Sequence, residues 1–211
     1  SGAKNLIDAF KSNLDIHTKT AMDIFHVDEK DVTKSMRRNA KAVNFGILYG
    51  ISSFGLSEDL GINVHDAKKF IDKYLETYPG IKDYMNKLIS DAYNDGYVKT
   101  LFGRTRYIEE LKSTNYIIKS TGERMALNTP IQGTSADIIK KAMIEIYDKF
   151  NELGLKSKMI IQVHDELVFD CKKEELEQVK NIVKETMENT YKLDVPLKVD
   201  INYGSSWYEA K

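Results

Sequence analysis

The sequence predicts an α+β fold: a mainly helical region, followed by part of an antiparallel sheet with helices packed on it. Three observations predict it. Amphipathic segments separated by proline and glycine fill the first part of the chain. Residues 157–171 are typical of strand, turn and strand, and residues 196–203 alternate apolar and polar positions as a strand does. Helices first and a sheet afterwards is the order of an α+β protein.

Four helices are expected before the first strand, at residues 16–25, 32–48, 64–77 and 81–93. Gly46 and Gly50 weaken and then end the second, because glycine has low helix propensity and favours helix ends. The run Tyr78-Pro79-Gly80 stops the third, and Asn94-Asp95-Gly96 closes the fourth. Pro and Gly therefore divide the helical region.

Proline and glycine also mark the boundaries of the later elements. Residues 97–108 predict a short hairpin around Phe102-Gly103, with Arg104 and Arg106 alternating onto one face. Helices are expected to resume near Lys119 and again from Pro130, which suits a first helical position, up to Gly154. An amphipathic helix at residues 174–191 and a strand at 196–203 complete the chain. We expect two domains, 1–120 and 121–211.

Composition excludes several classes of protein. Of the 211 residues, 42% are hydrophobic and 30% charged, an ordinary balance for a soluble chain. Cys171 is the only cysteine, which rules out a disulfide framework and a cysteine metal cluster and favours a reducing, cytoplasmic setting. No apolar run approaches the ~20 residues of a membrane helix, so no membrane partner is expected. The N-terminal Ser-Gly-Ala-Lys lacks the features of a signal peptide.

Basic residues gather in two places although the formal net charge is only −1. Residues 34–49 carry four basic side chains and no acid, and residues 97–106 carry three and no acid. Acidic side chains collect towards the C-terminus, from Asp170 to Glu188. Local basic faces on a neutral chain fit a protein that holds a phosphate backbone on one side only.

The expected helix at 32–48 carries a stripe with a four-residue period: Arg37, Lys41, Phe45 and Tyr49. Residues four apart lie on one helix face. Two cations followed by two aromatic rings can hold a triphosphate at one end and stack a base at the other. The alternative is an ordinary amphipathic helix with solvated cations and buried aromatic rings.

A second four-residue period joins Arg124, Asn128 and Gln132. All three side chains offer hydrogen-bond donors, and none is negatively charged. Every base pair presents acceptors in the minor groove, so a row of donors there would sense pair geometry without reading sequence. The alternative is that these side chains cap a helix and satisfy loop hydrogen bonds near Thr129-Pro130.

A third pattern is His164-Asp165-Glu166, at the tip of the hairpin expected at 157–171. Two carboxylates at a tight turn can approach a divalent ion, and Mg²⁺ prefers a few protein carboxylates together with phosphate oxygens. The alternative is an ordinary polar turn, where acidic residues are common.

Together these segments resemble the family A DNA polymerases, in its bacterial form, and the resemblance covers essentially the whole chain. Residues 37–50 (RRNAKAVNFGILYG) resemble motif B, and residues 162–167 (QVHDEL) resemble motif C. Residues 123–133 (ERMALNTPIQG) match the segment between the two motifs. Residues 15–21 (DIHTKTA) and the closing WYEAK are also similar to the family.

The resemblance implies a nucleotide site on the motif B helix. Arg37 and Lys41 would contact the triphosphate of the incoming nucleotide, and Phe45 would pack against its sugar and base. Phenylalanine instead of tyrosine at that position implies discrimination against dideoxynucleotides. Tyr49 would lie at the template base, and His17 at the edge of the nucleotide site.

The resemblance also implies DNA-contacting and catalytic residues. The DNA contacts would be Tyr49, Gly50, Arg104, Arg106, Arg124, Asn128, Gln132 and His164. The catalytic residues would be Lys41, Asp165 and Glu166, with Asp165 as a metal ligand. On this basis residues 1–120 would form a fingers subdomain and residues 121–211 the rear of a palm.

The implied function is DNA-directed DNA synthesis in bacterial replication and repair, in a cytoplasmic, nucleoid-associated enzyme. Two Mg²⁺ ions would serve the transfer of a deoxynucleotide to a primer on template DNA. The first metal-binding motif of the family, of the type DYSQIELR, does not occur in the sequence. We therefore expect the chain to need the remainder of a polymerase, including a thumb, and to be inactive alone. Two alternatives are a nucleotide- and DNA-binding module without catalysis, and an unrelated helical scaffold.

Overall fold

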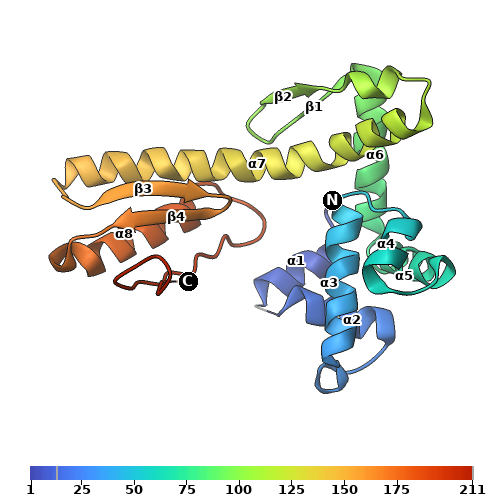
Figure 1. The fold of residues 1–211 in the computed structure, drawn as a ribbon, viewed down its shortest axis with the longest axis horizontal. Helices are drawn as coiled ribbons and strands as arrows, with labels where there is room; N and C mark the ends of the chain where they lie inside the picture. Colours follow the sequence, from blue (N-terminus) through green and yellow to red (C-terminus); the bar gives the residue numbers. More distant parts are fainter. Residues whose placement is uncertain (13, 211) are drawn as a thin grey trace. The chain divides into compact units, whose positions relative to one another are not determined.

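The computed structural model describes residues 1–12 and 14–210 and contains two compact units, Ser1–Ile131 and Gln132–Lys211 (Figure 1). It is mainly helical, with two small antiparallel sheets, which confirms the α+β fold class. The expected boundary between residues 120 and 121 falls inside helix α7 (Tyr116–Glu152), which contributes to both units. Among the described helices, none is both long and apolar enough to cross a membrane.

The first unit begins with six α-helices. They are α1 (Lys4–Lys11), α2 (Ile16–Phe25), α3 (Lys34–Leu48), α4 (Ser53–Leu60), α5 (Val64–Thr77) and α6 (Pro79–Asp95), with a short 3-10 turn η1 (Glu29–Asp31) between α2 and α3. Helices α2 and α5 have the expected bounds, and α3 starts two residues later than expected. Pro79 ends α5 but also begins α6, as the first-turn preference of proline allows. Helices α1 and α4 were not predicted from the sequence.

Side-chain caps explain where these helices begin. The Asp15 carboxylate accepts from the Thr18 amide at 2.7 Å and caps α2. The Asn63 side chain accepts from the Asp66 amide at 2.8 Å and caps α5. Each cap satisfies an amide that a helix leaves unpaired in its first turn. The same device starts α4, where the Ser52 hydroxyl accepts from the Gly55 amide.

The core of the first unit lies among α2 to α6. Val43 and Ile47 of α3, Leu56 of α4 and Tyr74 of α5 are all less than 5% exposed and belong to one cluster. Burial of such apolar side chains is the main driving force for folding. Because these residues fall on one side of α3, the opposite side of that helix is left to solvent.

A small hairpin follows in the same unit. Strand β1 (Tyr97–Lys99) pairs antiparallel with β2 (Thr105–Tyr107), which confirms the predicted hairpin. Arg106 lies in β2, whereas Arg104 precedes it in the connection. Beyond the hairpin, Ile108 and Leu111 of the region around η2 (Glu109–Lys112) pack with Ala126 of α7. The hairpin is thereby anchored to the first part of α7.

Helix α7 corrects one prediction. We expected separate helices beginning near Lys119 and at Pro130, but a single helix of 37 residues runs from Tyr116 to Glu152 with Pro130 inside it. Proline lacks an N–H and forfeits one backbone hydrogen bond there, yet its fixed φ is compatible with a helix. Gly154 ends the helix at a φ of +64°, as predicted.

The second unit is built on the predicted hairpin. Strand β3 (Lys158–Val163) pairs antiparallel with β4 (Glu166–Asp170), with an irregularity between Met159 and Ile161. Helix α8 (Leu176–Asn189) follows a 3-10 turn, η3 (Lys173–Glu175). Figure 1 shows the later part of α7 running along the hairpin. Phe150 of α7, Val179 of α8 and Phe169 of β4 share one core cluster.

The strand expected at residues 196–203 is not formed, because no ladder partner pairs with it in the described part of the chain. The alternation itself is real: residues 195–201 alternate between partly buried and exposed positions. One amide, that of Val199, donates to the Glu188 carboxylate of α8 at 3.2 Å. Alternation predicts which side chains face inward but does not supply the neighbouring strand that a sheet needs.

Candidate functional site

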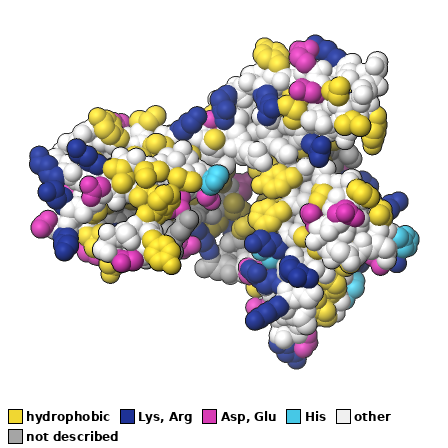
Figure 2. Space-filling model, viewed as in Figure 1, with side chains coloured by type: hydrophobic (Ala, Val, Ile, Leu, Met, Phe, Trp, Pro, Cys, Tyr) yellow, Lys and Arg dark blue, Asp and Glu magenta, His cyan; other side chains and the backbone are white. Residues whose placement is uncertain are grey.

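Helix α3 presents the predicted stripe to solvent. Arg37 and Lys41 are exposed, and the rings of Phe45 and Tyr49 are each 41% exposed. In Figure 2, basic side chains gather over one end of α3 and hydrophobic side chains lie at the other. The alternative of an ordinary amphipathic helix requires buried aromatic rings, which these are not. Cationic and aromatic side chains therefore share the solvent-exposed side of α3.

The two rings of the stripe are ordered. Phe45 and Tyr49 stack with ring centroids 6.3 Å apart and planes inclined by 11°. The Lys41 ammonium lies 5.9 Å from the centroid of the Phe45 ring, within the range of a cation–π contact. Cationic and aromatic groups thus form one continuous surface along α3.

Arg37 is held by a carboxylate of the neighbouring helix. Its Nε donates to Asp15 Oδ1 at 3.1 Å, and its terminal nitrogen donates to Asp15 Oδ2 at 2.8 Å. The hydrogen bond from Arg37 is the main reason that the pKa of Asp15 is well below its usual range. Asp15 also caps α2, so one carboxylate fixes both the start of α2 and the position of the guanidinium.

His17 stands beside the stripe. Its ring centroid lies 5.6 Å from that of Phe45, and its Nδ1 is 3.0 Å from the side-chain nitrogen of Asn44. Burial lowers the pKa of His17 below the ordinary value. The side chain is half-buried and borders the aromatic end of the α3 stripe.

The C-terminal end of α3 meets the first part of α7 at Gly50. Gly50 has a φ of +66°, a conformation that suits glycine. A Cβ placed there would lie 3.1 Å from Leu127 Cδ1 and 3.2 Å from Arg124 Cγ. Gly50, the residue after Tyr49, thus packs closely against Arg124.

The second predicted row lies on α7. Arg124 is exposed, Asn128 is partly buried, and both belong to the first unit, whereas Gln132 belongs to the second. Because α7 continues through Thr129 and Pro130, no helix end exists there to be capped, and the capping alternative is wrong. Asn128 Oδ1 is buried and has no hydrogen-bond partner among the described residues.

The arginines of the β1–β2 hairpin differ in their contacts. Arg106 donates from its guanidinium to Thr129 Oγ1 of α7 at 3.2 Å. The backbone amide of Arg104 donates to Thr100 Oγ1 at 3.2 Å, which fixes the connection between the strands. Both arginine side chains are exposed.

The turn between β3 and β4 carries the acidic motif. His164 has a φ of +52°, and its carbonyl accepts from the Gln162 side chain at 2.6 Å. Asp165 is exposed at the tip, and Glu166 begins β4 instead of lying in the turn. Glu166 Oε1 accepts from the indole nitrogen of Trp207 at 2.5 Å. The turn is therefore oriented by hydrogen bonds on both flanks of Asp165.

The donors for a divalent ion are sparse. In residues 1–12 and 14–210, no group of three or more histidine, cysteine or acidic side chains is arranged to hold a metal. Asp165 supplies one exposed carboxylate, the oxygen donor that Mg²⁺ prefers. Asp165 could therefore supply one ligand of a Mg²⁺ site, and the other ligands would have to come from other groups.

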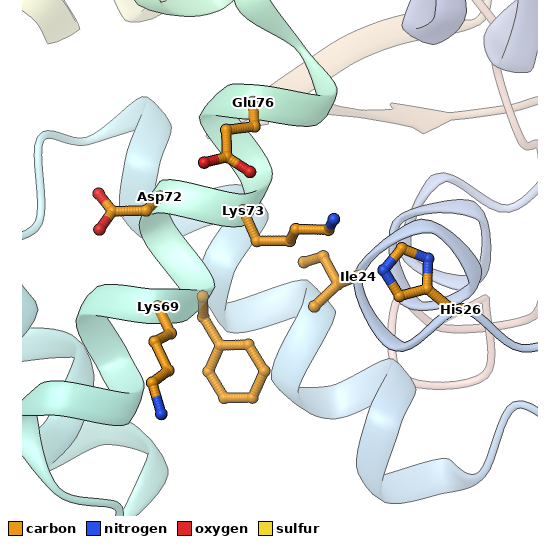
Figure 3. Close-up of a pocket in the computed structure, with 7 residues that line it drawn as sticks. Ile24, His26, Lys69, Asp72, Lys73 and Glu76 are labelled. Carbon is orange, nitrogen blue, oxygen red and sulfur yellow. The ribbon is translucent and has the colours of Figure 1, made fainter.

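A pocket of about 430 Å³ lies away from the motifs, between the end of α2 and α5 (Figure 3). Ile24 and Phe70 line it together with His26, and its charged lining residues are Lys69, Asp72, Lys73 and Glu76. Two cations face two anions there, so the pocket offers no net charge to a ligand. None of the predicted site residues lines it.

The residues around the α3 stripe form what we call the α2–α3 face: Asp15, His17, Arg37, Lys41, Asn44, Phe45 and Tyr49. The sequence analysis did not identify two of them, Asp15 as the partner of Arg37 and Asn44 as the partner of His17. The available signal for Asp15 was its position as a helix cap. For Asn44 it was the presence of an amide within the apolar side of α3, where a buried polar group needs a partner.

Comparison with known proteins shows the family of the chain. The model of the family described as DNA polymerase family A matches residues 1–209. DNA polymerase I of Bacillus subtilis (strain 168) is 57% identical over 208 residues, and that of Geobacillus stearothermophilus is 53% identical over 207. The match covers 99% and 98% of this chain but only 24% of each relative.

A solved structure gives the same result. The POL domain of Pol1 from M. smegmatis, in complex with DNA primer-template and dNTP, superposes with a TM-score of 0.93 at 42% identity. The superposition covers 97% of this chain and 36% of that one. The chain spans about a quarter of the length of its curated relatives, as 24% coverage indicates, and it belongs to DNA polymerase family A.

Proposed function

We propose that the chain is part of a DNA-directed DNA polymerase that adds deoxynucleotides to a primer in the 5′ to 3′ direction. Its partners would be primer-template DNA, deoxynucleoside triphosphates and the remainder of the polymerase, in the bacterial cytoplasm. Family membership supports the proposal. So does the likeness to a polymerase domain whose own structure contains primer-template and dNTP.

The observation that carries the proposal is the exposed face of α3. A solvated helix face normally avoids large aromatic rings, yet Phe45 and Tyr49 are both 41% exposed and lie in line with Lys41 and Arg37. Cations suit a polyphosphate, and aromatic faces suit a base. A deoxynucleoside triphosphate presents both chemistries in one molecule.

Each residue of this face has a proposed role. Arg37 and Lys41 would neutralise the phosphates, and Lys41 would act in catalysis by stabilising charge on the leaving group. Phe45 would pack against the sugar and base and Tyr49 against the template base. His17 would bind at the edge of the same site.

We propose that Asp165 ligates a divalent ion, Mg²⁺ in the working enzyme, and that Glu166 assists beside it. Such an ion, when bound, supplies a Lewis acid for phosphoryl transfer. The carboxylate of Asp165 is exposed, and the hydrogen bond from Trp207 keeps Glu166 oriented next to it. A second ion would need ligands from the remainder of the polymerase.

Primer-template contacts are proposed along α7 and the two hairpins. Donors in the minor groove would come from α7, backbone contacts from the β1–β2 hairpin, and a contact near the primer terminus from the β3–β4 turn. The residues are Tyr49, Gly50, Arg104, Arg106, Arg124, Asn128, Gln132 and His164.

A second candidate concerns the chain by itself, a nucleotide- and DNA-binding module without catalysis. The observation that favours it is the lack, within the described residues, of a cluster of metal ligands. Binding needs the α3 face alone, whereas two-metal catalysis needs several carboxylates in one place.

A titration with a deoxynucleoside triphosphate tests the proposal. Nuclear magnetic resonance should detect binding in the millimolar range, about −4 kcal/mol. Lys41→Ala should weaken it several-fold. Lys184→Ala is the matched control, since Lys184 is also an exposed helix lysine but lies on α8. Equal affinities in the two variants would remove Lys41 from the triphosphate site.

A further inference from the structure

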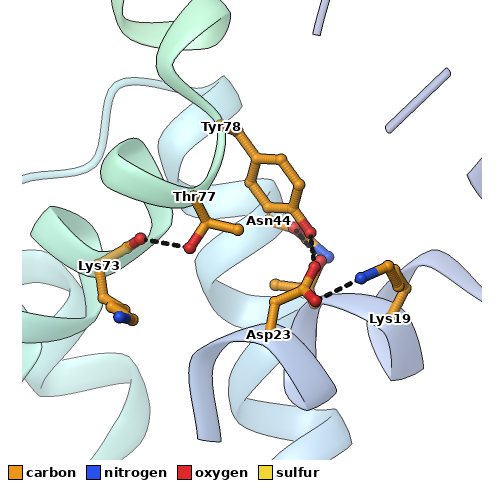
Figure 4. A network of polar contacts seen from close by, with 7 residues as sticks. Lys19, Asp23, Asn44, Lys73, Thr77 and Tyr78 are labelled. Carbon is orange, nitrogen blue, oxygen red and sulfur yellow. Dashed lines mark hydrogen bonds and ion pairs between the residues drawn. The ribbon is translucent and has the colours of Figure 1, made fainter. Parts of the chain in front are cut away.

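A buried polar chain leads from the interior of the first unit to His17. Thr20 of α2 and Asn44 of α3 are 0% and 6% exposed, so water does not compete for their side chains. Thr20 Oγ1 donates to Asn44 Oδ1 at 3.1 Å, and Asn44 Nδ2 lies 3.0 Å from His17 Nδ1. Figure 4 shows Asn44 gathered with Asp23 and Tyr78 between the helices.

The Thr20 hydroxyl has two polar neighbours across the helix interface, the Asn44 side chain and the Tyr78 hydroxyl. Asp23, three residues further along α2, binds other groups. Its two oxygens are already engaged, one by the Lys19 ammonium and the other by the Tyr78 hydroxyl at 2.7 Å. The Thr20 hydroxyl donates to Asn44 Oδ1 at 3.1 Å, so the amide oxygen of Asn44 lies on the Thr20 side.

The orientation of the amide then decides the state of the imidazole. With its oxygen taken, Asn44 turns its NH₂ group towards His17 Nδ1. An amide nitrogen donates and does not accept, so Nδ1 must carry a lone pair. A neutral imidazole has a single N–H, which must therefore sit on Nε2, on the far side of the ring from Asn44.

We propose that Asn44, oriented by Thr20, is a positioning residue that fixes His17 as the Nε2–H tautomer and thereby gives the nucleotide face a neutral hydrogen-bond donor. The role towards nucleotide rests on the proposed function, whereas the tautomer does not. An anionic phosphate or sugar oxygen is the class of group that such a donor would bind.

The charged neighbours agree with a neutral ring. Protonation would place a second N–H at Nδ1, facing the NH₂ group of Asn44, and two donors would then oppose each other. Burial lowers the pKa of His17 most; the Asp15 carboxylate opposes this effect, and the cations Arg37 and Lys41 add to it. Arg37 and Lys41 thus carry the positive charge of the site, while His17 provides a neutral N–H donor with a fixed orientation.

The test is a long-range ¹H–¹⁵N correlation spectrum of the chain near neutral pH, with His17 assigned through His17→Gln. The wild-type ring should show an unprotonated Nδ1 and a protonated Nε2. Thr20→Val preserves the shape and removes the orienting hydroxyl, so the tautomer ratio should fall about fivefold, as for one ordinary hydrogen bond. Asn44→Asp should move the proton to Nδ1 and raise the pKa of His17.

Thr77→Val is the matched control, because the Thr77 hydroxyl donates to the Lys73 carbonyl, away from His17, and its loss should leave the ring unchanged. An Nδ1–H tautomer in the wild type, or no change in Thr20→Val, would overturn the proposal. Added dATP should shift the Nε2–H signal. If dATP binds in a Lys41-dependent way but the Nε2–H signal does not shift, only the donor role of His17 is contradicted. Absence of nucleotide binding contradicts the proposed function and the donor role, and leaves the tautomer result to stand.

Discussion

The α2–α3 face and the β3–β4 turn are both predicted to serve one reaction, but they differ in how far the chain itself completes them. On the α2–α3 face, functional side chains hold one another: Asp15 holds Arg37, Asn44 holds His17, and Phe45 stacks with Tyr49. At the turn, Asp165 is exposed and lies in no described cluster of metal ligands.

The difference separates binding from chemistry. Side chains that are already ordered lose little conformational entropy when a ligand arrives, which favours binding. A lone carboxylate cannot assemble a two-ion centre, which needs several oxygen ligands. The first region is therefore expected to function within this chain, and the second only together with further ligands.

The largest expected effect is on catalysis. The 211-residue chain should not extend a primed template with Mg²⁺, because the described residues provide no cluster of carboxylates. Loss of one anchor of a two-ion site should cost several kcal/mol of transition-state stabilisation, a rate decrease of roughly 10²-fold or more. A primer-extension gel provides the measurement. If the pure chain extended the primer and Asp165→Ala abolished that extension, the β3–β4 turn would not need further metal ligands for catalysis.

The next effect compares the packing beneath the two regions. Leu56, 0% exposed under the α3 face, should destabilise the first unit by about 3 kcal/mol when changed to alanine. Ile160, 55% exposed on β3, should change stability by about 0.5 kcal/mol or less in the same substitution. Urea unfolding measures both. Equal losses would mean that the hairpin is as tightly packed as the helical core.

A smaller effect concerns the Asp15–Arg37 pair. Since the folded state lowers the pKa of Asp15, the unfolded state takes up its proton first as the pH falls. The stabilisation from this pair is therefore present above the pKa of Asp15 in the unfolded state, which is about 4, and is lost progressively below it.

Asp15→Asn should remove that part of the pH dependence, so its unfolding midpoint should fall less than that of the wild type between pH 6 and pH 3. Asp72→Asn, at an exposed position of α5, is the matched control. A wild-type slope in Asp15→Asn would show that the pair does not stabilise the fold.

Local signals in the sequence predicted much of the fold. Helices α2 and α5 have the expected bounds because caps and breakers determine where helices begin and end. The helix start predicted at Pro130 does not occur, because α7 accommodates this proline in its interior. Residues 196–203 misled because alternation does not reveal whether a partner strand exists.

The candidate site could be predicted in part for the same reason. The stripe of α3 is visible because its members are four residues apart on one helix. The partners of that stripe are not, since Asp15 lies 22 residues from Arg37 and Asn44 lies 27 from His17. Contacts of that kind depend on how α2 packs against α3, which no local pattern encodes.

The most direct test of the difference between the two regions is a map of amide chemical shifts on adding a deoxynucleoside triphosphate to the chain, first without and then with Mg²⁺. Changes without Mg²⁺ should gather on residues 15–17 and 37–49, while residues 164–166 should change little. Changes that are largest at the β3–β4 turn, or that spread evenly over both units, would contradict the claim that α2 and α3 form a binding face by themselves.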